Sequence, residues 1–141
     1  MTRRELLSAA GRSGARLEHE GDPALLDGAR RALLVSRGER APRPDTPWVA
    51  GLVAATRQIA AQKEVLVTGA GRTAFDAALW VCAQQGGAAI VTLQQAPSGG
   101  EEWRAFLPAR RLLVWPASPA RTDAARREPD RLIGALANPA Y

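Results

Sequence analysis

The chain alternates short apolar runs of strand length with longer segments of helical periodicity. The first two runs are 32–36 and 65–68, and the other two are 88–93 and 112–115. Continuous apolar runs of this length are typical of strands buried on both faces, as in parallel sheets. Parallel neighbours also need long crossover connections, which the intervening segments supply. The pattern predicts an α/β fold of three layers: a parallel sheet of at least four strands, with right-handed crossovers and helices on both faces.

Two of the intervening segments carry the clearest helix signals. Pro47 favours a helix start, and apolar residues recur every three or four positions from there to Lys63. The segment from Thr73 to about Gln85 has the same periodicity, and a Gly-Gly pair follows it. We therefore expect two amphipathic helices that flank the strand at 65–68.

The two ends of the chain are expected to differ from this alternating body. A capping-box pattern at the start predicts a short helix, and 11–23 has no clear period, which predicts a loop or mobile arm. We therefore expect residues 1–29 to form an N-terminal helix and arm, and residues 30–141 to form one domain. Two further short helices are expected, one at 101–107 and one that begins at Pro129.

The charge is basic, and arginine carries almost all of it. The 141 residues have a formal net charge of +5, with nineteen basic side chains of which only Lys63 is lysine. Arginine binds phosphate through two parallel hydrogen bonds, so this composition favours a polyanionic partner. An alanine-, glycine- and arginine-rich chain is also what a GC-rich genome encodes, so the basic balance has a second explanation.

Cysteine content and hydropathy indicate the cellular compartment. Cys82 is the only cysteine, so no internal disulfide can form, which fits a reducing cytoplasm. No apolar run is long enough to cross a bilayer, and no signal-like apolar stretch follows the start of the chain. We expect a cytoplasmic protein that does not associate with a membrane.

The most informative functional segment follows the second apolar run. It reads Gly69, Ala70, Gly71, Arg72 and Thr73 and leads directly into a predicted helix. Backbone N–H groups at a helix start, together with a guanidinium, form a place to hold an anion. The G-x-G spacing lacks the third glycine of the dinucleotide fingerprint and the lysine of a P-loop. The two glycines can equally be turn residues that permit positive φ, so both interpretations stay open.

Acidic residues supply the few candidates for catalysis. Thr73 and Asp76 form a capping-box pattern, which favours a helix-capping role for Asp76. If the chain is an enzyme, Asp76 is the candidate catalytic acid or base. Glu101 and Glu102 are adjacent on a predicted helix, so they cannot readily act as a pair. The lone His19 stands among acidic residues without placeable partner ligands, so we expect no metal and no cofactor. The tryptophans are at positions 48, 80, 103 and 115 and are expected to be mostly buried.

Three segments together resemble the DNA-processing protein A (Smf) family and the wider group of Rossmann-like nucleotide-binding domains. Leu33 to Arg37 is similar to the family's opening strand, which ends in a small residue and an arginine. Val65 to Gly87 is similar to its strand, S-G-x-A-R-G-x-D turn and alanine-rich helix, and 130–137 resembles its R-N-R-I-I-x-G-L-S helix. This sequence departs from the family pattern at three positions: Thr73 replaces a glycine, Asp76 lies one position later than the family's acidic residue, and Asp130 replaces an asparagine.

The resemblance implies a cytoplasmic, Rossmann-like domain that forms a homodimer and binds single-stranded DNA or a nucleotide. Carried over by position, it places Arg37, Gly69, Arg72 and Arg131 on the phosphate-binding surface. The resemblance thus points to the same turn as the local analysis.

Two alternatives to a binding module remain open. The first is a hydrolase of nucleotides or nucleoside phosphates that uses the crevice at a switch point of the sheet. The P-G-G-x-G-T-x-x-E motif of the Lonely-guy phosphoribohydrolases, which share this broad fold, is absent. The second is a domain that has lost its ligand and serves assembly through an open sheet edge near Tyr141.

Overall fold

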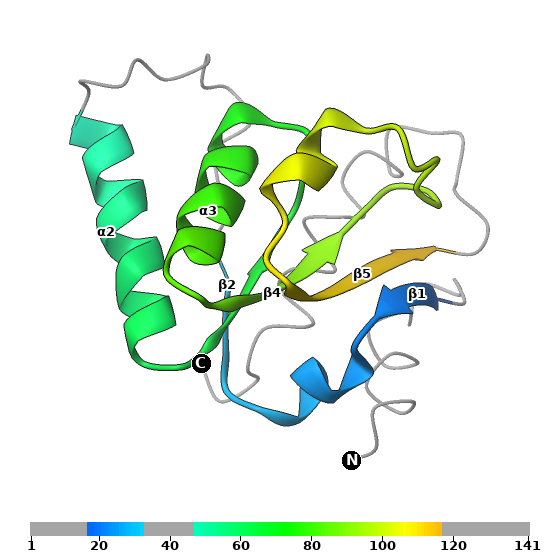
Figure 1. Ribbon diagram of the computed structural model, residues 1–141, viewed down its shortest axis with the longest axis horizontal. Helices are drawn as coiled ribbons and strands as arrows, with labels where there is room; N and C mark the ends of the chain where they lie inside the picture. The colour runs from blue at the N-terminus through cyan, green and yellow to red at the C-terminus, as the bar shows by residue number, and fades with distance from the viewer. Residues whose placement is uncertain (1–16, 33–46, 117–141) are drawn as a thin grey trace.

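The computed structural model describes residues 17–32 and 47–116 (Figure 1). In chain order its elements are strand β1 (Leu17–Gly21), 3₁₀ helix η1 (Pro23–Asp27), strand β2 (Arg30–Ala32), helix α2 (Pro47–Ala61), strand β3 (Val65–Thr68), helix α3 (Thr73–Gln84), strand β4 (Ala88–Thr92), 3₁₀ helix η2 (Glu102–Phe106) and strand β5 (Arg110–Pro116).

The five strands form one sheet in the order β1-β5-β4-β3-β2. β2, β3, β4 and β5 are mutually parallel, as predicted, and Val67 lies opposite Ile90 in the centre. β1 pairs with β5 in the antiparallel direction, so the sheet is mixed rather than wholly parallel. The α/β class and the strands at β3, β4 and β5 are confirmed.

The strand order explains where the helices lie. From β2 to β5 each new strand is added beside the previous one in the same direction. Since parallel crossovers are nearly always right-handed, connections that advance in one direction keep their helices on one face. Figure 1 shows α2, α3 and η2 together on one side of the sheet, whereas η1 lies against β4 and β5 on the other. In the described residues the α-helices therefore cover one face, and a 3₁₀ helix contributes to the other.

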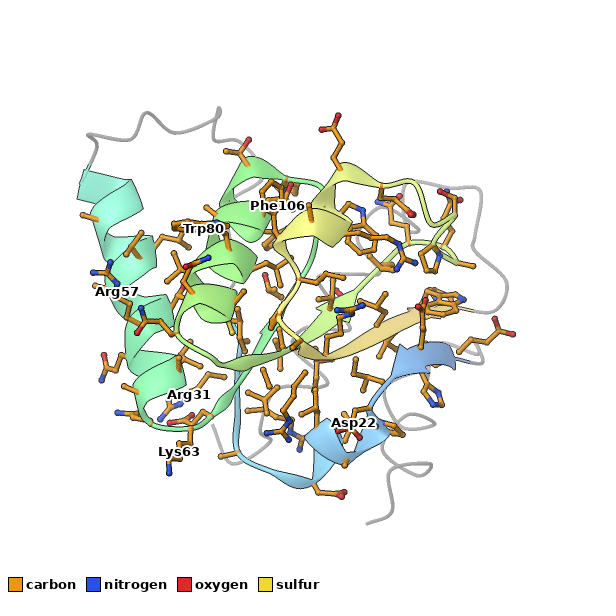
Figure 2. The ribbon with its side chains drawn as sticks, viewed as in Figure 1. Asp22, Arg31, Arg57, Lys63, Trp80 and Phe106 are labelled. Carbon is orange, nitrogen blue, oxygen red and sulfur yellow. The ribbon has the colours of Figure 1, made fainter. Side chains whose placement is uncertain are left out.

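Side chains of the sheet point alternately to two cores. The η1 face buries an apolar cluster that consists of Leu25, Leu26, Val65, Val67, Phe75, Ala88, Ile90, Leu112 and Val114. The helix face buries a second cluster, in which Leu66, Ala89, Val91 and Leu113 of the strands meet Leu52, Ala78, Leu79, Cys82 and Trp103. Burial of both sheet faces accounts for the apolar runs in the sequence. Of the tryptophans, Trp103 and Trp115 are buried, but Trp80, labelled in Figure 2, is 52% exposed on α3.

The prediction of a loop or mobile arm at 11–23 is wrong for residues 17–21, which form strand β1. Leu17 packs against the η1-face core, and the register pairs Glu18 with Trp115 across the two strands. The indole Nε1 of Trp115 donates to Glu18 Oε2 at 3.2 Å. Because β1 is an edge strand with mostly exposed polar residues, its sequence carries no apolar alternation, and pairing with β5 decides its conformation. Described residues on both sides of position 30 therefore share one sheet.

Two predicted boundaries shift. β2 begins at Arg30, two residues before the apolar run, because its backbone pairs with β3 from Arg30 opposite Val65 onward. Beside this pair, Arg31 Nε donates to Glu64 Oε2 at 2.6 Å. α2 begins at Pro47, as predicted, and ends at Ala61 rather than Lys63. The expected N-terminal helix, the helix from Pro129 and residues 33–36 lie outside the described residues.

Candidate anion-binding pocket

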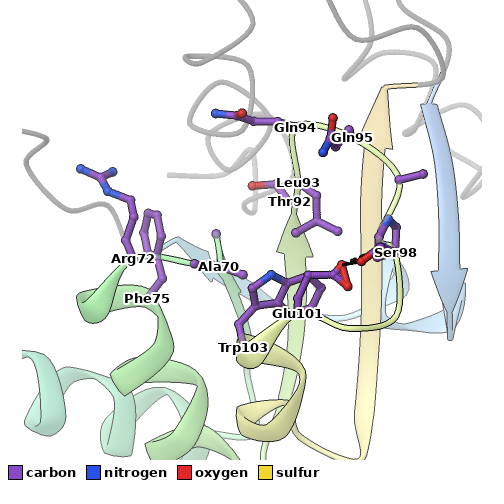
Figure 3. Close-up of a pocket in the computed structure, with 14 residues that line it drawn as sticks. Ala70, Arg72, Phe75, Thr92, Leu93, Gln94, Gln95, Ser98, Glu101 and Trp103 are labelled. Atoms are coloured by element: carbon purple, nitrogen blue, oxygen red, sulfur yellow. Dashed lines mark hydrogen bonds between the residues drawn. The ribbon is translucent and has the colours of Figure 1, made fainter.

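A pocket of about 590 Å³ opens at the carboxyl ends of β3 and β4 (Figure 3). Its lining comes from the turn after β3, the start of α3, the loop after β4 and the start of η2. The lining residues are Gly69, Ala70, Gly71, Arg72, Phe75, Thr92, Leu93, Gln94, Gln95, Ala96, Pro97, Ser98, Glu101 and Trp103. Ligands of open α/β sheets bind at this end of the strands.

The glycines of the turn have different structural roles. Gly71 has φ +85°, a conformation that favours glycine, and its N–H donates to Asp76 Oδ1 at 2.9 Å. Gly69 is buried beneath Phe75: a Cβ at this position would lie 2.7 Å from the ring carbon Cε2. Packing and turn geometry therefore account for both glycines, and the N–H of Gly71 already has an acceptor.

The start of α3 differs from the predicted capping box. The N-cap is Arg72 rather than Thr73, and the side chain of Arg72 makes no capping hydrogen bond. The carboxylate of Asp76 does reach back, but to Gly71, because the tight turn brings that N–H into range. The first intrahelical bond runs from the Asp76 N–H to the Arg72 carbonyl at 2.9 Å. The N–H groups of Thr73, Ala74 and Phe75 precede it and belong to the orphan donors of a helix start.

Arg72 brings a cation to this helix start. Its guanidinium carbon lies 5.3 Å from the centre of the Phe75 ring, within the range of a cation–π contact. Figure 3 shows the two side chains together on one side of the pocket. Arg72 is the one basic side chain among the described lining residues. Arg72 and Phe75, which has one of the orphan N–H groups, thus line the same wall, and Thr73 and Ala74 adjoin it in the first turn of α3.

A carboxylate holds the opposite wall. Glu101 Oε2 accepts the N–H of Ser98 at 2.7 Å, and Oε1 accepts the N–H of Gly99 at 2.8 Å. Arg104 lies 3.4 Å from Glu101 and also 3.4 Å from Glu20 of β1, so the loop is tied to the sheet edge. Desolvation acts to raise the pKa of Glu101, but the hydrogen bonds from Ser98 and Gly99 outweigh it and lower the pKa to about 2. The carboxylate is ionised at neutral pH.

Asp76, the sequence candidate for acid or base chemistry, is not among the residues that line the pocket. Burial raises the pKa of its carboxyl, the hydrogen bond from Gly71 opposes the rise, and the nearby charge of Glu102 adds to it. Its position fits a structural acceptor that joins the glycine turn to α3.

The structure does not test every residue of the predicted site. Gly69, Ala70, Gly71 and Arg72 line one pocket, and Thr73 begins the adjoining helix. Arg37 and Arg131 lie outside the described residues. The described ranges hold eight basic and eight acidic residues, so the net charge of +5 comes entirely from the sequence outside them.

The pocket is not at a topological switch point of the described strands. The order from β2 to β5 advances without reversal, so the crevice lies between strands added in succession. Within the described residues, no three His, Cys, Asp or Glu side chains gather as a metal site would require. No helix there has the length and apolar content needed to span a bilayer.

The architecture permits a comparison with solved structures. The fold resembles that of DNA processing protein A. The X-ray structure of DNA processing protein A (DprA) from Streptococcus pneumoniae superposes with a TM-score of 0.63, at 19% sequence identity, over 86% of this chain. This chain spans 43% of that protein's chain, and at this identity the likeness shows the fold alone. No protein-family model matches the sequence, and neither does any curated protein.

Sequence reasoning missed the second wall of the pocket. The sequence predicts Glu101 only as a candidate acid or base, yet Ser98 and Glu101 have the S-x-x-E spacing of a capping box. That spacing could have predicted the observed bonds to the loop. No local pattern indicates that Trp103 and Phe75 would meet the same pocket, because their approach depends on the packing of η2 and α3.

Proposed function

We propose that this pocket binds the phosphate of a nucleotide unit, either as a free nucleotide or as part of single-stranded DNA. The observation that carries the proposal is the position of Arg72, which lines the pocket as the N-cap residue of α3. A guanidinium supplies charge-assisted hydrogen bonds to phosphate, and the helix start supplies N–H groups and a favourable dipole.

The remaining lining suits the rest of a nucleotide. A volume of about 590 Å³ falls within the range of small-ligand pockets. Trp103 and Phe75 line it with little exposed surface, 9% and 3%, and the exposed Gln94 and Gln95 contribute amide donors and acceptors. A mostly apolar lining with a few polar groups is typical of small-ligand pockets.

The likeness to a DNA processing protein favours single-stranded DNA as the source of the nucleotide, by analogy of fold. We extend the proposal to Arg37 and Arg131 as further phosphate contacts, to a homodimer and to the cytoplasm, on the sequence resemblance and the cysteine content. The basic excess in the sequence outside the described ranges supports contacts with a polyanion beyond the pocket.

The test compares oligo-dT of ten nucleotides with the full chain and its R72A variant at several salt concentrations. We expect R72A to weaken binding about tenfold, because a charge-assisted hydrogen bond is lost, and to reduce the salt slope by about one. The matched control is R110A, since Arg110 is exposed at the amino end of β5, away from the pocket. Equal affinity and slope for R72A and the wild type would remove the pocket from the proposal.

A further inference from the structure

The pocket has walls of opposite charge. Arg72 stands on one side with Phe75, and Glu101 stands on the other with Ser98, with Ala70 and Trp103 between them (Figure 3). Glu101 lines the pocket and is partly exposed, at 21% of its side-chain surface, so its charge stays in contact with water.

Among the described residues, the partners of Glu101 do not neutralise its charge. Arg104 is shared between Glu101 and Glu20, and these three side chains together carry a net charge of −1. The other partners of Glu101 are the neutral N–H groups of Ser98 and Gly99 and the Ser98 hydroxyl. A phosphate placed at this wall would face the negative charge of a carboxylate that its hydrogen bonds hold in place.

From this polarity we propose that Glu101 determines the orientation and the class of ligand. The pocket takes a nucleotide unit with one phosphate, which lies at Arg72, while the uncharged base and sugar lie toward Glu101. A free nucleoside monophosphate and the terminal nucleotide of a strand share this chemistry. An internal nucleotide, which has phosphates on both sides, would bring one of them against Glu101. This inference rests on the proposed function.

The experiment measures affinities of the full chain for thymidine 5′-monophosphate and for thymidine 3′,5′-bisphosphate by calorimetry at low salt. Coulomb repulsion across a few ångströms of partly hydrated pocket predicts that the bisphosphate binds about three- to tenfold more weakly. In E101Q we expect this ratio to fall to about two or less. An oligo-dT with free hydroxyls at both ends, whose terminal nucleotides each have one phosphate group, tells the two sources apart. Tighter binding than the monophosphate indicates a strand end, and weaker binding indicates a free nucleotide.

The matched control is E102Q, which removes the same charge one residue away, at an exposed position that does not line the pocket. E102Q should keep the wild-type ratio. A wild type that binds both ligands equally, or an E101Q variant that loses affinity for both without a change in their ratio, overturns the role of Glu101 but leaves phosphate binding intact. A wild type that binds neither ligand overturns the proposed function and this inference together.

Discussion

Asp76 accepts the backbone N–H of Gly71 at 2.9 Å, and this bond joins the glycine turn after β3 to the first turn of α3. The positive φ of Gly71 brings its N–H within reach of the carboxylate. One consequence is that this hydrogen bond stabilises the turn from within the chain. Another is that the orphan N–H groups left for an anion are those of the helix start itself.

The Asp76 carboxyl gives the fold a specific pH dependence. Its pKa is raised mainly by burial, so the folded state binds a proton more tightly than the unfolded chain does. Stability from this group is therefore greatest below the ordinary carboxyl pKa and declines as the pH rises through the folded value. In D76N the amide oxygen can still accept from Gly71, and this decline should disappear.

Urea unfolding of the wild type and D76N between pH 3 and 7 measures the effect. We expect the two stability curves to converge at low pH and D76N to be the more stable near pH 7. A D76N variant that matches the wild type at low pH but is less stable than it near pH 7 would show instead that the ionised carboxylate is the better acceptor.

Gly69 is constrained by the ring of Phe75. In G69A the new methyl would overlap Cε2, which is 2.7 Å away, and the ring must move within a packed core. We expect a loss of about 1–3 kcal/mol in the free energy of unfolding. G100A is the control, because a Cβ there has open space. If G69A and the wild type have the same urea midpoint of unfolding, the Phe75 ring can move aside at no cost, and Gly69 is not required for packing.

Glu101 clamps the loop that forms one pocket wall. In E101A the N–H groups of Ser98 and Gly99 lose their acceptors, so hydrogen exchange at these two amides should accelerate at least about tenfold. E102A should leave both rates unchanged. Because the pKa of Glu101 is lowered to about 2, the clamp should persist at pH 4 and weaken only as the pH falls toward that value. Loss of protection already between pH 6 and 5 would contradict the assignment.

Arg30 is a buried cation in β2 with 6% of its surface exposed. Its Nε and Nη1 have no hydrogen-bond partner among the described residues, and burial lowers its pKa against the opposing charge of Asp27. We expect R30M to raise the free energy of unfolding by about 1–2 kcal/mol, since unsatisfied buried donors are costly. Thermal unfolding of R30M and of the control R110M, which replaces an exposed arginine, measures the change in stability of each variant from the wild type. A destabilised R30M would mean that the guanidinium makes a compensating interaction.

Periodicity predicts the parts of the fold that packing reinforces. The sequence pattern and the core agree in five elements: the strands β3, β4 and β5 and the helices α2 and α3. In each of them, apolar residues of the pattern are buried in the structure. β1 carries no such pattern, because Glu18 and Glu20 lie on an edge strand and meet Trp115 and Arg104 only through the tertiary fold.

The site divides in the same way. The turn from Gly69 to Arg72 is local, so the sequence locates it, and the S-x-x-E spacing before η2 is a local signal too. Sequence cannot indicate that these two turns face each other across one pocket. That juxtaposition depends on the order of β3 and β4 in the sheet and on the packing of η2 against α3.

The central claim is that Arg72 and the start of α3 hold a phosphate. The most direct test is a titration of the isotopically labelled full chain with thymidine 5′-monophosphate, followed by the backbone amide resonances. The account predicts that the largest shifts fall on Arg72, Thr73 and Ala74, with smaller shifts at the Trp103 indole. Saturating shifts confined to residues away from this pocket, or no shifts at millimolar ligand, would contradict it.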